Sequence, residues 1–145
     1  MGVLCLMLGA AFQVNSMVFL ELTGQRQMNA ATRTLQERME AIRGLTFSQL
    51  TDCSYLQNTL LANDASMAAS LPALVEVVSV SAYPPAGSPI RLTRQNGATA
   101  INSTNATLAS GTVVRVDLSV SWTSRGGRAR NHQTSAVVAK TSLSP

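Results

Sequence analysis

The chain has 145 residues, a formal charge of +4 and only 12% charged residues. This length allows one domain, or one domain with an appendage, and the mostly neutral, polar surface argues against a nucleic-acid-binding protein. A single histidine, two cysteines and seven scattered carboxylates offer no metal cluster and no acid/base pair. We therefore expect a protein that is not an enzyme and that carries no metal or other cofactor.

The first 12 residues contain no charge and continue without a proline into a helical pattern that extends to about Arg43. Such a helix is about 65 Å long at ~1.5 Å per residue, more than twice the diameter of a small domain. Part of it must protrude. We expect residues 1–24 to form an apolar stem that is buried in lipid or among neighbouring stems. The packing residues predicted for this stem are Leu4, Leu6, Leu8, Phe12, Val18 and Leu20.

The nature of this stem is open to three interpretations. As a membrane span, its apolar run is short of the ~20 residues usually needed, and Gln13, Asn15 and Ser16 interrupt it. As a cleaved signal peptide, it lacks a preceding Lys or Arg, and the helical pattern continues past any cleavage point. In the third interpretation, which we favour, the natural chain begins upstream and the first residues belong to the middle of a longer stem.

Apolar residues recur at steps of three and four from Gln25 to Arg43, and Gly44 provides a stop. This stripe predicts that helix 25–43 lies on a sheet. The residues predicted to contact the sheet are Met28, Leu35, Met39 and Ile42. Residues 44–74 are expected to form an irregular connection with one short helix, Asp64–Leu71, which Pro72 ends. Cys5 and Cys53 lie too far apart to form a disulfide within one chain if the long helix is continuous.

An antiparallel sheet is predicted for residues 75–140. Its first strand, Val75–Tyr83, has an alternation that slips between Val77 and Val78 and predicts a bulge. The next strand, Ile90–Arg94, is followed by a tight turn at Gln95–Gly97.

The clearest strand is Thr112–Trp122, which has one apolar and one polar face. Its predicted core residues include Val116, Leu118, Val120 and Trp122. Ser124–Arg128 reads as a hairpin turn and Ala129–Lys140 as the returning strand, where His132 is expected to be structural. The helix of residues 25–43 is the one long element able to cover the apolar face. We therefore predict an α+β fold, with a head of residues 25–145 and a long N-terminal helix packed by its C-terminal half on an antiparallel sheet.

Three stretches carry a resemblance to a known family. They are the apolar stem running into Met28–Leu50, with Leu35-Gln-Glu-Arg-Met-Glu-Ala-Ile-Arg43, the strand-rich head, and the closing hairpin Val116–Arg128, with Val116-Asp-Leu-Ser-Val-Ser-Trp122. On these residues the chain resembles the type IV pilin-like proteins, especially minor pilins of the PilV type and minor pseudopilins of type II secretion. The family's basic leader, its glycine cleavage site and the following Phe-Thr-Leu-x-Glu have no counterpart here, so no cleavage site or N-terminal glutamate is assigned.

The resemblance implies a pilin-like fold and a structural role. The protein would be held in the bacterial inner membrane by a single-pass helix, with its head in the periplasm, and then assembled into a type IV pilus or a type II secretion pseudopilus. The implied partners are other pilin or pseudopilin subunits through the stem, the inner-membrane assembly platform and the lipid bilayer.

A binding module is the alternative hypothesis. A tethered or secreted β-rich head would recognise a surface, a polysaccharide or DNA through arginines. The candidate polyanion contacts are Arg125, Arg128 and Arg130 near one hairpin, together with Arg91, Arg94 and Arg115 on the strands. A small hydrolase is a distant third, because the required side-chain constellations are missing.

Overall fold

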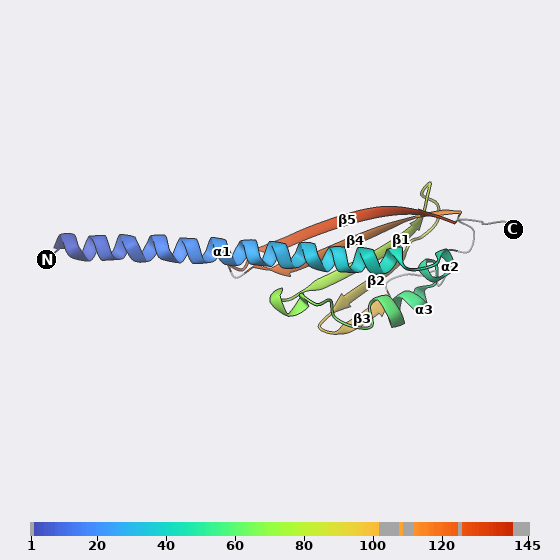
Figure 1. Ribbon diagram of the computed structural model, residues 1–145, viewed down its shortest axis with the longest axis horizontal. Helices are drawn as coiled ribbons and strands as arrows, with labels where there is room; N and C mark the ends of the chain where they lie inside the picture. Colours follow the sequence, from blue (N-terminus) through green and yellow to red (C-terminus); the bar gives the residue numbers. More distant parts are fainter. Residues whose placement is uncertain (1, 102–107, 109–111, 125, 141–145) are drawn as a thin grey trace.

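The computed structural model describes residues 2–101, 108, 112–124 and 126–140, and the side chains of residues 2–11 lie outside this description. The fold is α+β. One long helix, α1 (Gly2–Arg43), lies along a five-stranded antiparallel sheet and continues far beyond it (Figure 1). The predictions for Leu4, Leu6, Leu8 and Arg125 therefore concern side chains outside the described part of the chain.

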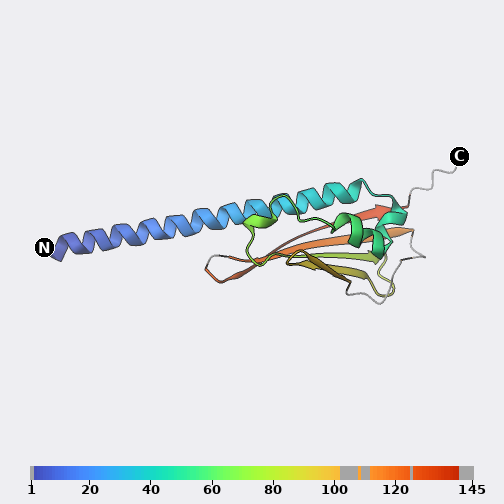
Figure 2. The same cartoon turned by 90° about the horizontal axis from the view of Figure 1, so that it is seen from below.

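The sheet has the strand order β3-β2-β1-β4-β5. Its strands are β1 (Val75–Ala82), β2 (Ile90–Gln95), β3 (Ala98–Ile101), β4 (Val113–Thr123) and β5 (Ala129–Ala139). Asn96 and Gly97 both have positive φ, 51° and 77°, which is the requirement of a two-residue hairpin turn between β2 and β3. Figure 2 shows two layers, with α1 and the connecting segment on one face of the sheet and no described element on the other.

The predicted bulge in β1 was wrong. Val75 to Val80 pair in unbroken register with β2 on one side, and the register with β4 on the other side is also continuous. Side chains alternate regularly, so that Glu76, Val78 and Val80 all face the core. The apparent slip came from reading Glu76 as a solvent-facing residue.

The core lies between α1, the connecting segment and the inner face of the sheet. The buried residues of β4 are Val114, Val116, Leu118, Val120 and Trp122, and α1 contributes Ala30, Ala31, Leu35, Met39 and Ile42. The sequence predicted eight residues in the packing of helix on sheet, four on each element. Seven of these eight are buried in the structure. The exception is Met28, whose predicted place in the core was wrong because its side chain is 45% exposed.

Met28 leaves the core because of helix geometry. An α-helix drifts by ~20° per heptad, so two heptads separate Met28 from Ile42 by about 40° of rotation. Gln27, Ala30 and Ala31 occupy the buried face instead. Met28→Ala should therefore change the free energy of unfolding by less than ~1 kcal/mol, whereas Leu35→Ala should lower it by about 2–5 kcal/mol. Urea unfolding followed by circular dichroism measures both, and equal effects would contradict this arrangement.

Short helical turns fill the connection between α1 and β1. They are α2 (Phe47–Leu50), α3 (Cys53–Tyr55), the π-turn η1 (Leu56–Leu60) and the 3₁₀ turn η2 (Ala68–Ser70). Thr46 and Gln49 form a capping box at the start of α2, and Asp52 accepts hydrogen bonds from two backbone amides at the start of α3. The predicted helix Asp64–Leu71 is reduced to η2. Leu50, Leu56, Leu60 and Leu61 point into the core, so this irregular segment covers the part of the sheet that α1 leaves open.

Candidate functional site: the apolar stem and its junction with the head

The described stem exposes an unusual amount of apolar surface. Its large hydrophobic side chains from Phe12 to Leu22 are all at least 45% exposed, and Phe12 reaches 73%. They are Phe12, Val14, Met17, Val18, Phe19, Leu20 and Leu22. These positions lie on every side of the helix, which is the pattern of a helix buried all round. The predicted stem residues Phe12, Val18 and Leu20 are thus left largely uncovered by the described residues of their own chain.

Two polar side chains of the stem satisfy their own hydrogen bonds. Ser16 Oγ donates to the Gln13 carbonyl at 2.8 Å, and Thr23 Oγ1 donates to the Phe19 carbonyl at 2.8 Å. These bonds remove hydroxyl donors that would otherwise require water. The stem is therefore more compatible with an apolar environment than its sequence alone suggests. Within the described residues, however, no helix meets the length and hydropathy expected of a membrane span.

A cleft lies where α1 separates from the sheet. It has a volume of about 700 Å³, with one wall from α1 between Met17 and Met28 and the other from the β4–β5 hairpin. Trp122, the only tryptophan of the chain, contributes to its lining and is itself buried. Arg128 and Arg130 line the hairpin side and are exposed. The cleft thus lies where the apolar stem emerges from the head.

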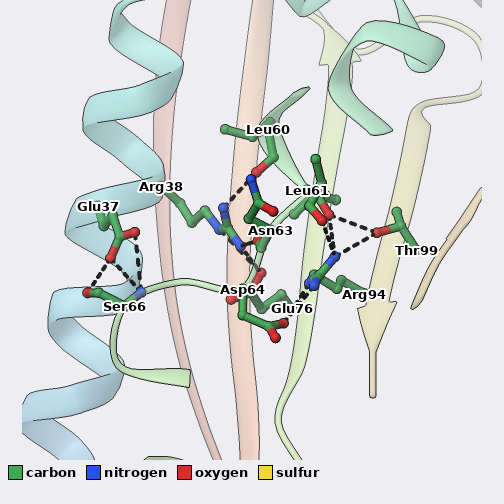
Figure 3. A network of polar contacts seen from close by, with 11 residues as sticks. Glu37, Arg38, Leu60, Leu61, Asn63, Asp64, Ser66, Glu76, Arg94 and Thr99 are labelled. Carbon is green, nitrogen blue, oxygen red and sulfur yellow. Dashed lines mark hydrogen bonds and ion pairs between the residues drawn. The ribbon is translucent and has the colours of Figure 1, made fainter. Parts of the chain in front are cut away.

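A buried arginine fastens the connecting segment to α1 (Figure 3). Arg38 of α1 donates to Glu76 Oε2 of β1 at 2.9 and 3.2 Å, and to the carbonyls of Leu60 and Asn63 at 2.6 and 2.7 Å. Both charged side chains are almost fully buried, at 9% and 4% exposure. Glu76 Oε1 has no hydrogen-bond partner among the described residues. One guanidinium therefore neutralises a core carboxylate and also holds two carbonyls of the loop.

A second arginine holds the same loop from the sheet. Arg94 of β2 donates to Asp64 Oδ1 at 2.7 and 3.0 Å and also to the carbonyls of Leu61 and Ala62. Thr99 of β3 donates to the Leu61 carbonyl at 3.1 Å. Together, Arg38 and Arg94 bind four consecutive carbonyls, those of residues 60–63, from opposite sides (Figure 3). We call these two residues the arginine clamp.

Glu37 adds a third, exposed attachment beside the clamp. Its carboxylate accepts hydrogen bonds from Ser66 Oγ at 2.6 Å and from the Ser66 amide at 3.0 Å (Figure 3). The hydroxyl bond is the main reason that the pKa of Glu37 is lowered from its ordinary value, and burial opposes this shift.

The lowered pKa of Glu37 predicts a small acid sensitivity. A carboxyl whose pKa is depressed in the folded state stabilises that state above the ordinary glutamate range, near pH ~4.3, and loses this contribution as the pH falls through its folded pKa. Glu37→Gln should therefore flatten the dependence of the urea midpoint on pH below that range and leave it unchanged near neutrality. Glu40→Gln, one turn away and paired only with Arg43 at the surface, is the matched control. An identical acid dependence in wild type and Glu37→Gln would contradict the prediction.

The arginines predicted as polyanion contacts do not form one surface. Arg94 is buried in the clamp, and Arg115 pairs with Asp117 at 2.9 Å on the outer face. Arg91 is exposed on that same face, while Arg128 and Arg130 lie at the cleft. Arg125 lies outside the described residues. The structure therefore separates Arg91 and Arg115 from Arg128 and Arg130.

Cys53 and His132, the other side chains of possible chemical interest, lie within the packed head. Cys53 is buried, and burial, with a smaller contribution from Asp52, raises the pKa of its thiol. His132 lies opposite Val120 in the β4–β5 pair. Across the described ranges, no group of three or more histidine, cysteine or acidic residues is placed to hold a metal ion.

The arginine clamp was not predicted from the sequence. A signal for it exists, because Glu76 shares the inward face of β1 with Val78 and Val80, and a buried carboxylate requires a cationic partner. Arg38 likewise falls on the buried face of α1, between Leu35 and Ile42.

Comparisons with protein families, with curated proteins and with solved structures find no match to this chain.

Proposed function

We propose that this protein is a structural subunit of a bacterial filament, a minor pilin or pseudopilin that is held in the inner membrane before its assembly into a type IV pilus or a type II secretion pseudopilus. The observation that carries the proposal is the exposed apolar stem, Phe12 to Leu22, on the same helix that packs into the head. A pilin-like layout also accounts for the resemblance in residues 28–50 and 116–128.

The physical basis is the burial of the stem outside its own head. Full burial of a large apolar side chain contributes about 1.5–3 kcal/mol, and seven such side chains are exposed between Phe12 and Leu22. Lipid and a bundle of neighbouring stems provide similar burial, so transfer from membrane to filament exposes little apolar area to water. The amides of Gln13 and Asn15 can then form hydrogen bonds between helices, as polar side chains do within membrane bundles.

Deletion of the gene tests this proposal. Cells without it should form fewer or altered filaments, or should lose secretion or adhesion, and a plasmid copy should restore the phenotype. Antibody against the head should detect the protein in the membrane fraction and in filaments sheared from the cells. Normal piliation, secretion and adhesion in the deletion strain, with no protein in purified filaments, would count against a structural role.

A head that binds polyanions through its sheet is less well supported. Of the four described arginines on strands, Arg94 binds within the clamp, Arg115 pairs with Asp117, and Arg130 lies at the cleft. Arg91 is the one that remains exposed on the outer face. Retention of the protein on a polyanion column that falls steeply with salt would favour this second function.

A further inference from the structure

Backbone hydrogen bonds hold the described residues on both sides of the cleft between α1 and the β4–β5 hairpin. The α1 wall is regular helix. On the other wall, the Ser124 amide donates to the Arg128 carbonyl at 2.8 Å and the Gly127 amide donates to the Ser124 carbonyl at 2.8 Å. Gly127 has φ 73°, which favours glycine in this turn. The backbone of Arg128 is held by its bond with Ser124, and that of Arg130 by its pairing with Trp122.

Both arginines lie on the side of the hairpin that faces α1. Arg130 is the cross-strand partner of Trp122, which is buried on the inner face of the sheet, and Arg128 lies two residues earlier on the same side. The opposite wall provides the apolar Met17, Leu20 and Met28. The cleft thus combines two guanidinium groups with apolar side chains at the level where the exposed stem begins.

The charges of the cleft are not balanced within the described part of the molecule. Glu21 is the one carboxylate among the lining residues, and none of the ion pairs between described residues uses Arg128 or Arg130. Arg26, on the same stretch of α1, is also exposed and absent from those pairs. Net positive charge therefore gathers beside an apolar helix, the arrangement that suits an anionic membrane surface.

We propose that this cleft is a docking site for the phosphate groups of anionic lipids, with Arg128 and Arg130 as the contacts. The inference rests on the proposed membrane anchorage of the stem. When residues 12–22 lie among acyl chains, the cleft reaches the headgroup layer, which extends beyond the ~30 Å hydrocarbon core on each side. Arg128 and Arg130 then bind phosphate oxygens, and the apolar wall lies against the upper part of the acyl chains.

Vesicle flotation of the full chain tests the proposal. The protein, diluted from detergent, is mixed with vesicles of phosphatidylcholine alone or of phosphatidylcholine and anionic phosphatidylglycerol in equal parts. Wild type should bind the anionic vesicles more tightly at low salt, and the difference should shrink as salt is added. The double variant R128Q/R130Q should lose about five-fold in affinity for anionic vesicles per arginine and should keep its affinity for the neutral vesicles.

Two further variants make the result specific. R128K/R130K keeps the charge and should retain the preference for anionic vesicles. R91Q/R115Q removes the same charge from the outer face, and Arg115 lies eight residues along β4 from Thr123, about 26 Å from the hairpin. This control should bind like wild type. Near-UV circular dichroism of Trp122 checks that each variant keeps its packed core.

The outcomes separate the two proposals. If wild type and R128Q/R130Q bind anionic vesicles equally, or if R91Q/R115Q loses as much affinity as R128Q/R130Q, the headgroup site is overturned. Binding of these proteins to neutral vesicles would then still support the membrane anchorage of the stem. Failure to bind either kind of vesicle overturns both proposals. Binding of duplex DNA without lipid, lost in R128Q/R130Q, also overturns the headgroup site and assigns the two arginines to a soluble polyanion.

Discussion

Replacing Arg38 with methionine is expected to lower the free energy of unfolding of the head by about 3–5 kcal/mol. The substitution leaves the Glu76 carboxylate buried without a cation and removes the donors to the Leu60 and Asn63 carbonyls. Removing one partner of a buried ion pair costs more than the pair contributes, because the remaining charge stays desolvated. Urea unfolding of the full chain, with every variant in the same detergent, measures the change.

Two variants define the origin of this loss. Arg43→Met removes an arginine from the same helix. Because the side chains of Arg43 and of its partner Glu40 are each 68% exposed, the free energy of unfolding should change by at most ~1 kcal/mol. The double variant R38M/E76L removes both buried charges and should be more stable than R38M alone. A urea midpoint for R38M equal to that of wild type, or a double variant less stable than R38M, would contradict the role of the clamp.

Val18→Asp is expected to reduce retention in the membrane by up to about 100-fold and to prevent incorporation into filaments. Val18 lies within the exposed apolar stem, close to the cleft. An acidic side chain costs about 2.5–3.5 kcal/mol at the centre of a membrane helix, and this sets the upper limit for Val18. The head should fold normally, because Val18 contributes nothing to its core. Fractionation of cells and immunoblotting of sheared filaments measure the two effects.

Ala41→Asp provides the matched control. It introduces the same acid into the same helix, at an exposed position beside the head. Membrane retention and filament incorporation should equal those of wild type. Wild-type amounts of the Val18→Asp protein in membranes and filaments would instead show that the stem is not buried in either.

The long elements could be predicted from the sequence because each has one uninterrupted pattern. The helical pattern to Arg43, ended by Gly44, and the strict alternation of Val114–Trp122 correspond to α1 and β4. The short strand β3 and the turns of the connection have no such period. Their positions depend on caps such as Thr46 and Asp52 and on contacts with distant residues.

The interactions that hold the head together were harder to predict than its elements. Arg38 and Glu76 are separated by 38 residues, and Arg94 and Asp64 by 30. Periodicity assigns each residue to a face but does not pair residues across the fold. Glu76 on the buried face of β1 therefore produced the false bulge, and the buried Arg94 was assigned to a polyanion surface. At the cleft, the sequence placed Arg128 and Arg130 in one hairpin, whereas their position beside the stem follows from how β4 and β5 run along α1 (Figure 1).

The continuity of α1 also has a mechanical consequence. Because the stem and the head share one helix that runs alongside β4 and β5 (Figure 1), tension applied through the stem acts along the sheet. The helix would have to slide past the strands, so its contacts resist in shear and share the force instead of breaking one after another. Arg38 binds Glu76 of β1 and so links α1 directly to the sheet, where it acts as a cross-link against that sliding.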